Sequence, residues 1–136
     1  MKKLFLILIT LFFVVGCHEK NMDCELTIIE KSDLKIIKKV ELNYKNDKIK
    51  NEKVTISYIT DKNVDTMKSS LESQYEKYLN YEGIVYYFND TEVGFDFIID
   101  ANLKKLDKLI ISELELIDYK YDKAYQNFRN NGYVCK

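Results

Sequence analysis

The segment from Asp61 to Glu72 has acidic and amide side chains at the spacing of a calcium-binding loop. Asp61, Asn63 and Asp65 fit the first, third and fifth positions of such a loop, and Glu72 fits its last. An EF-hand also needs glycine at the sixth position for its sharp turn, where this chain has Thr66. The pattern is therefore more typical of acidic residues that cap a helix, and we expect no metal ion.

Two carboxylates, Asp96 and Asp100, are predicted to share the outward face of one strand. Glycoside hydrolysis uses a pair of carboxyl groups separated by roughly 5 to 10 Å. Four residues along a strand span roughly 13 Å, which exceeds that separation. With Glu82, these acids could serve a hydrolase or an accessory factor, which is the alternative function. Solvated surface acids explain them more simply, so we expect no catalytic residue.

Histidine, the commonest catalytic base, occurs once in the chain, as His18. A nucleophile with a histidine base would require His18 to fold back from the N-terminal region, so we expect this residue to be a bystander. Together with two cysteines it supplies too few ligands for a structural zinc site. The sequence therefore predicts no cofactor and no enzyme.

The N-terminal segment has the pattern of an export signal. Lys2 and Lys3 precede an apolar run from Leu4 to Val15, in which Thr10 is the one polar residue. The run is shorter than the roughly 20 residues of a membrane-spanning helix. Its length and its charged start are typical of a cleaved secretory signal, so we expect residues 1–16 to be removed.

Cys17 follows Val14, Val15 and Gly16, an order that resembles the lipobox at which bacterial signal peptidases cut before a lipid-modified cysteine. The resemblance implies a diacylglycerol on the Cys17 sulfur and an acyl chain such as palmitate on the new amino terminus. Each buried CH₂ contributes about 0.8 kcal/mol, so two chains anchor a protein firmly. We therefore expect a protein on the extracytoplasmic side of the cell membrane. An ordinary cleaved signal peptide is the alternative.

Lipid on Cys17 would leave Cys24 and Cys135 as a pair, in a compartment that permits disulfides. We predict that they are bonded. The bridge would close a loop of roughly 110 residues and remove about 4 to 5 kcal/mol of unfolded-chain entropy. Two separate thiols are the alternative.

The charge of the mature chain argues against nucleic acid as a partner. Loss of residues 1–16 removes two of the 21 basic side chains and none of the 22 acidic ones, which leaves a formal charge of −3 with His18 neutral. This balance predicts no basic footprint for nucleic acid or for a polybasic membrane contact. The remaining 120 residues suit one compact domain.

Alternation of apolar and polar residues predicts an antiparallel sheet, built from a three-strand meander and a hairpin. Ile49 is out of phase with the apolar residues that follow it, which predicts a bulge. The predicted strands are residues 24–29, 34–44, 48–59, 84–88 and 93–99.

Helical spacing predicts one long amphipathic helix over residues 61–81 and a shorter C-terminal helix over residues 121–128. Between residues 100 and 118 two alternatives stay open, a turn of helix or a strand over 109–117. The fold class is thus α+β. We expect a signal peptide over 1–16, a lipidated tether over 17–23 and a single domain over 24–136.

Several short segments together set the layout of the mature chain. They are Val14–Cys17, Cys24, Tyr44–Ile49, Tyr78–Val85, Ile99–Leu103 and Asn131–Lys136. This layout resembles the YehR-like family of small bacterial lipoproteins, over nearly all of the mature chain. The resemblance implies a small α+β domain outside a membrane, with no established enzymatic activity. The segment Asp100–Asn102 departs from the family's pattern because it is less turn-like.

The chain holds 11 tyrosines and 7 phenylalanines. Tyr81, Tyr86, Tyr87 and Tyr119 could line a groove for a sugar, peptide or lipid, although packing within the fold is the commoner role of tyrosine in a small sheet. The sequence thus predicts a non-enzymatic, lipid-anchored binding domain. Its partner would be an envelope protein or a small ligand.

Overall fold

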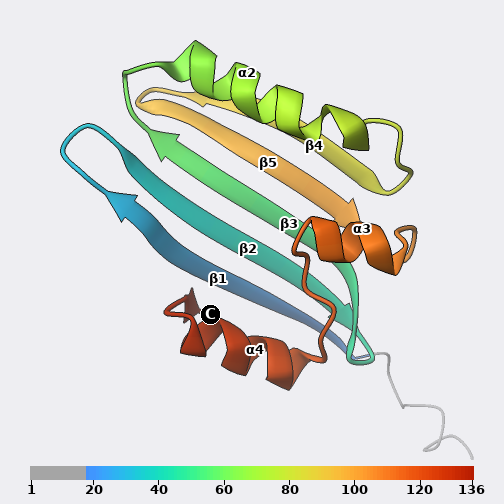
Figure 1. Cartoon of the computed structure of the whole chain (residues 1–136). Helices are drawn as coiled ribbons and strands as arrows, with labels where there is room; N and C mark the ends of the chain where they lie inside the picture. The colour runs from blue at the N-terminus through green and yellow to red at the C-terminus, as the bar shows by residue number, and fades with distance from the viewer. Residues whose placement is uncertain (1–17) are drawn as a thin grey trace, which may run out of the picture.

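The fold is built on one antiparallel sheet, seen in a computed structural model that describes residues 18–136 (Figure 1). Within these residues the strand order is β4-β5-β3-β2-β1-β6. The strands are β1 (Glu19–Glu30), β2 (Lys35–Lys45), β3 (Lys48–Ile59), β4 (Ile84–Thr91), β5 (Gly94–Asn102) and β6 (Val134–Cys135). The expected meander is β1-β2-β3 and the expected hairpin is β4-β5, which pairs with β3.

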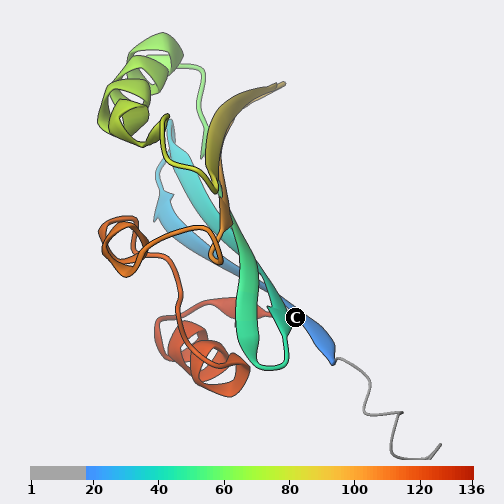
Figure 2. The same cartoon turned by 90° about the vertical axis from the view of Figure 1, so that its right-hand side faces the viewer.

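The helices all cover the same face of the sheet, as Figure 2 shows from the side. They are α2 (Val64–Tyr75), the 3₁₀ turn η1 (Glu76–Tyr78), α3 (Lys108–Glu113) and α4 (Tyr121–Asn130). None of the helices in the described part is long and apolar enough to cross a membrane. The predicted α+β class with an antiparallel sheet is confirmed, and the helical layer leaves the opposite face uncovered.

Alternation along the strands separates the two faces. In β2, Val40, Leu42 and Tyr44 are buried against the helices, and their polar neighbours point the other way. Phe95 and Phe97 of β5 continue the same core. Burial of such side chains is worth about 1.5 to 3 kcal/mol each, so this layer dominates the stability of the fold.

The predicted irregularity at Ile49 is present. Asn43 lies opposite Asn51 while Tyr44 lies opposite Ile49, so Lys50 is the extra residue of a bulge. The shift allows Ile49 to pack against the core although its spacing from Val54 is odd.

Residues 19–23, which we expected to belong to a tether over 17–23, are part of strand β1, which begins at Glu19. Met22 pairs with Leu42 and is fully buried, and its neighbours Asn21 and Asp23 lie on the uncovered face. Met22 is the one apolar residue in this part of the strand. A single apolar residue among polar ones is too little to show the alternation of a strand, so the sequence did not predict this part of β1. Cys17 lies outside the described residues.

The single long helix expected over 61–81 is instead two shorter pieces. Asn63 has a left-handed φ of 56° without a side-chain cap, and α2 ends at Tyr75. The chain then tightens into η1, whose geometry aligns residues three apart. This keeps Tyr78 on the side of Tyr75, with their ring centroids 5.9 Å apart, and Tyr78 is buried.

Residues 108–113 form helix α3, so the strand alternative for 109–117 does not apply. The Asp107 side chain caps this helix by accepting a hydrogen bond of 2.9 Å from the Ile110 N–H. Ile110 and Ile111 are consecutive and both buried. This pair fits neither the 3.6-residue period of a helix nor the two-residue period of a strand, so the sequence left both alternatives open.

The chain ends beside its first strand. β6 pairs with β1 so that Cys135 lies opposite Cys24, and a disulfide joins them across a separation of 111 residues. The predicted pairing of these cysteines is therefore present in the structure.

Candidate ligand cleft

The tyrosines considered for a binding groove are spread over the molecule. Tyr86 and Tyr87 are neighbours in β4, so they point to opposite faces of the sheet. Tyr86 packs near Phe97, with 5.9 Å between ring centroids, whereas Tyr87 is exposed. Tyr81 is exposed after η1, and the carbonyl of Tyr119 accepts a hydrogen bond from a residue of β2. The four do not line one groove.

The acids considered for hydrolysis are likewise apart. Asp96 and Asp100 share the uncovered face, opposite Ser57 and Lys53 respectively. The hydrogen bond and charge of Lys105 lower the pKa of Glu82, which is unfavourable for a general acid. These acids do not combine into a pair of catalytic type.

The calcium-like segment is mostly helical. Helix α2 starts at Val64, directly after Asn63, so Asp65 and Glu72 lie within a helix rather than in a loop. Within residues 18–136 no group of three or more His, Cys, Asp or Glu side chains could hold a metal ion. His18 is exposed, and its carbonyl accepts a hydrogen bond of 3.1 Å from the Asn46 N–H.

The most unusual ionisable group is Glu52 of β3, which the sequence analysis did not single out. It is the one buried charged residue of the described chain, with 2% of its surface exposed. Glu52 is in phase with Val54, Ile56 and Tyr58, so strand alternation turns it toward the helices. That phase, a charge among inward apolar positions, is the signal in the sequence that could have identified it.

Glu52 connects the sheet to the segment between α3 and α4. Its Oε2 accepts a hydrogen bond of 2.7 Å from the Ile117 N–H. Burial raises the pKa of Glu52 to about 7, although the Ile117 N–H and the charge of Lys38 act in the opposite direction. The carboxyl group is therefore balanced between its neutral and ionised forms near neutral pH.

Glu52 borders a cleft of about 330 Å³ between the sheet, α4 and the segment before α4. The lining residues are Leu26, Lys38, Val40, Glu52, Glu115, Ile117, Asn127, Phe128, Asn131 and Tyr133. Its walls are thus partly apolar, with polar groups of both charges and two amides.

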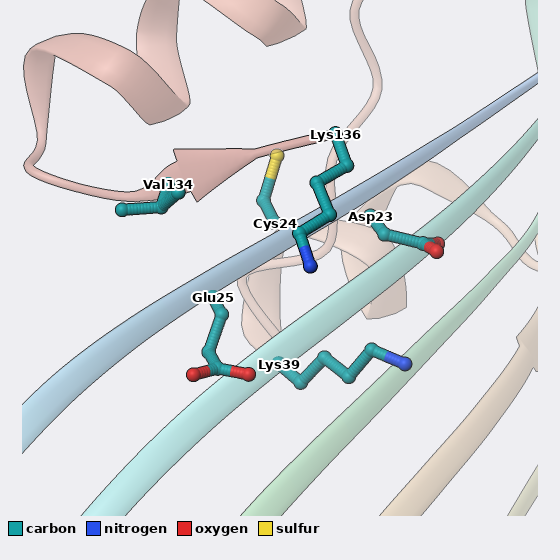
Figure 3. Close-up of a pocket in the computed structure, with 6 residues that line it drawn as sticks. All are labelled: Asp23, Cys24, Glu25, Lys39, Val134 and Lys136. Carbon is teal, nitrogen blue, oxygen red and sulfur yellow. The ribbon is translucent and has the colours of Figure 1, made fainter.

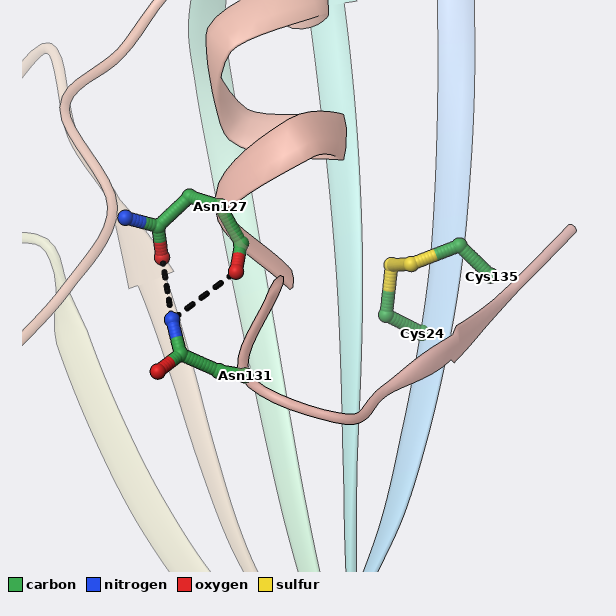
Figure 4. Close-up of a disulfide and its surroundings, with 4 residues drawn as sticks. All are labelled: Cys24, Asn127, Asn131 and Cys135. Atoms are coloured by element: carbon green, nitrogen blue, oxygen red, sulfur yellow. Dashed lines mark hydrogen bonds between the residues drawn. A yellow bond between two sulfur atoms is a disulfide. The ribbon is translucent and has the colours of Figure 1, made fainter. Parts of the chain in front are cut away.

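Figure 4 shows how the two amides are held. The Asn131 side-chain N–H₂ donates to the backbone carbonyl of Asn127 at 2.8 Å and to the Asn127 side-chain oxygen at 3.1 Å. Burial, followed by the charge of Glu52, raises the pKa of Tyr133. Glu115 has a left-handed φ of 53°, a conformation that costs a non-glycine residue about 1 kcal/mol or more.

Comparisons with protein-family models, with curated proteins and with solved structures find no match for this chain. The chemistry of the cleft therefore has to be judged from its own side chains. Its lining contains no serine, cysteine or histidine that could act as a nucleophile or as a matched base. An apolar wall with a few convergent polar groups is the usual form of a small-molecule site.

Two further hollows lie apart from this cleft. One, of about 400 Å³, includes Asn21, Asn43 and Asn51, which lie side by side on adjacent strands. The other, of about 520 Å³, lies beside the disulfide and is lined by Asp23, Cys24, Glu25, Lys39, Val134 and Lys136 (Figure 3). Neither contains a buried ionisable group.

Proposed function

We propose that this protein is a lipid-anchored domain of the bacterial cell envelope that binds a small ligand and carries out no catalysis. Its N-terminal signal and the lipobox-like residues before Cys17 support the anchor. The Cys24–Cys135 disulfide supports an oxidising compartment, because such bonds are rare in the cytosol. The resemblance to the YehR-like lipoproteins belongs to this proposal.

The anchor would hold the domain close to the membrane. β1 starts at Glu19, two positions after Cys17, and pairs from that residue onward with β2. Two residues of extended chain span at most about 7 Å. Lipid on Cys17 would therefore place this end of the sheet at the headgroups.

The observation that carries a binding role is Glu52. Burial of a carboxyl group costs free energy, yet no salt bridge compensates Glu52 in the described chain. It borders a cleft with a second acid, Glu115, and the amides of Asn127 and Asn131. A primary amine would find carboxylate and carbonyl acceptors there, in competition with the ammonium group of Lys38.

This site can be tested by NMR titration of the protein with ethanolamine, putrescine and spermidine. We expect saturable shifts of the amide resonances of Ile117, Asn127 and Asn131. The shifts should be lost in Glu52→Gln and retained in Glu41→Gln, which removes a carboxylate on the opposite face. Shifts that are absent, or that are equal in both variants, would contradict the site.

The alternative of an envelope hydrolase or accessory factor would depend on Glu82, Asp96 and Asp100. A broad screen of the purified protein for turnover of glycans, peptides and phosphoesters decides the matter. Turnover that is abolished by Asp96→Asn or Asp100→Asn would overturn the proposed non-enzymatic role.

A further inference from the structure

The described chain begins beside the turn that joins β2 and β3. Glu19 pairs with Lys45, which in turn lies opposite Lys48. The Asn46 N–H donates to the carbonyl of His18 at 3.1 Å. The turn and the start of β1 therefore form one end of the molecule (Figure 1).

Lysines gather at this end, which we call the lysine end and define as residues 18–20, 45–50, 104 and 118–123. It contains seven lysines and four acids. The lysines are Lys20, Lys45, Lys48, Lys50, Lys104, Lys120 and Lys123, and the acids are Glu19, Asp47, Asp118 and Asp122. With His18 neutral, the formal charge is +3 in a mature chain whose total is −3.

Contacts between different elements hold these residues together. The Lys20 ammonium lies 4.9 Å from the ring centroid of Tyr121, at the start of α4. Lys50 Nζ lies 3.0 Å from Glu19 Oε1. The Leu103 N–H donates to the Lys50 carbonyl at 2.9 Å, which brings Lys104 to the same end.

The opposite end of the sheet has the opposite charge. Residues 30–35, 61–68 and 90–92 contain six acids and four lysines. Lys62 and Asp33 form an ion pair of 3.4 Å, and Lys68 pairs with Asp90, so these three segments are neighbours. The molecule is thus electrically polar along the strands, and its positive end is where Cys17 precedes the domain.

We propose that the lysine end is a docking surface for anionic lipid headgroups, which orients the domain on the membrane with the acidic end outward. This inference rests on the proposed lipid anchor, because the anchor would bring the lysine end to the bilayer. Anionic lipids attract lysine side chains near the membrane surface, and this attraction decays over about one Debye length from the surface. Tyr119 is exposed at this end, where tyrosine suits the headgroup layer.

Amine labelling of the full mature protein in vesicles tests this orientation. One vesicle preparation contains phosphatidylcholine alone, and the other contains phosphatidylcholine with phosphatidylglycerol. Acetylation of Lys45 and Lys48 is compared with that of Lys31 and Lys62 by mass spectrometry. We expect roughly threefold protection of the first pair on anionic vesicles, reduced at high salt, with no protection of the second pair.

Two variants complete the test. Lys45→Gln with Lys48→Gln should lower the protection of Lys20 and Lys50, whereas Lys31→Gln with Lys62→Gln should leave it unchanged. Equal labelling of both ends on anionic vesicles overturns the docking surface.

The mass of the Cys17 peptide in the same sample reports the anchor separately. If Cys17 carries lipid and both ends label equally, the docking surface is wrong and the anchor stands. If Cys17 is unmodified, the anchor is wrong, and labelling is measured on the vesicle-bound fraction. Absence of a bound fraction then overturns the docking surface as well.

Discussion

At the scale of single residues, Glu52 links the candidate cleft to the stability of the fold. Burial gives its carboxyl group a folded-state pKa of about 7, above the ordinary glutamate value of 4.5. The folded protein therefore holds a proton that the unfolded chain has released between these two values. By linkage, the free energy of unfolding contributed by Glu52 is fully present below about pH 4.5 and is lost as pH rises through about 7.

We predict that the free energy of unfolding falls by about 2 to 3 kcal/mol between pH 5 and pH 8 through Glu52. Glu52→Gln should flatten this dependence, because the amide stays neutral and keeps an oxygen for the Ile117 N–H. Urea unfolding followed by circular dichroism at several pH values measures it. Glu41→Gln is the matched control, and an unchanged slope in Glu52→Gln would show that another group titrates.

The residue types indicated which side chains were candidates for a site, and the fold determines which of these candidates lie close together. The Cys24–Cys135 disulfide was predictable because the expected assignment of Cys17 to lipid leaves two cysteines, which can pair with each other. Glu52 was not predicted, because a charge within a strand is normally solvated. Its neighbours in the cleft, Asn127 and Asn131, lie 75 and 79 positions further along the chain. No local pattern in the sequence could predict that these residues lie close to Glu52.

At the scale of elements, the pairing of β3 with β5 depends on Gly94. This residue has a φ of +149°, and a Cβ built on it would lie 1.9 Å from the Tyr58 carbonyl oxygen of β3. Such a contact with backbone cannot be relieved by rotating a side chain. The first residue of β5 must therefore be glycine.

We predict that Gly94→Ala lowers the free energy of unfolding by about 3 kcal/mol or more, since it combines backbone strain with a steric clash. Gly132→Ala is the control. Gly132 also has positive φ, but its added Cβ would meet Leu26 Cδ1 at an ordinary 3.7 Å. It should cost about 1 kcal/mol. Equal losses in thermal or urea unfolding would contradict the proposed clash.

The short strand β6 depends on its disulfide, because it consists of only two residues paired with β1. We predict that Cys135→Ser lowers the free energy of unfolding by about 2 to 5 kcal/mol. Hydrogen exchange at Asp23 and Glu25, whose N–H groups face the C-terminal segment, should rise in the same variant, while exchange in β5 stays slow. Cys24→Ser should give an equal loss of stability. Rapid alkylation of both cysteines in the native protein would rule out the bond.

Strands were more predictable than helices in this chain. In β2 and β3 apolar residues occur at every second position because one face of each strand is buried, and the structure shows these residues on the buried face. The helices lie over the sheet as short pieces, so their ends depend on contacts with it. Tyr78 ends the helical region by entering the core, where its hydroxyl lies 3.1 Å from Glu113 Oε2. The sequence near Tyr78 carries no sign of Glu113.

At the scale of the whole molecule, a helical layer on one face and a polar surface on the other give the domain two unlike sides (Figure 2). The lysine end adds a third distinction, along the strands. A lipid at Cys17 would therefore present a defined side of the domain to its surroundings. The net charge of the chain does not show this separation of charge, because the positive and negative ends cancel in the total.

The proposed lipid anchor gives a prediction at this scale. Cys17→Ala should release the protein from the membrane fraction or leave it unprocessed, and it should abolish labelling with radioactive palmitate. Cys135→Ser should retain the label, because its sulfur is not the lipid acceptor in our proposal. Persistent label in Cys17→Ala would place the lipid on another residue.

The pairing of the last strand with the first also sets an order of events in biosynthesis. A ribosome makes Cys24 111 residues before Cys135, so Cys24 waits for its native partner while the intervening chain is translated. During that time Cys17 is the one cysteine close to it. Early alkylation of the Cys17 sulfur would remove this competitor, so lipid transfer would act as a protecting group for correct oxidation.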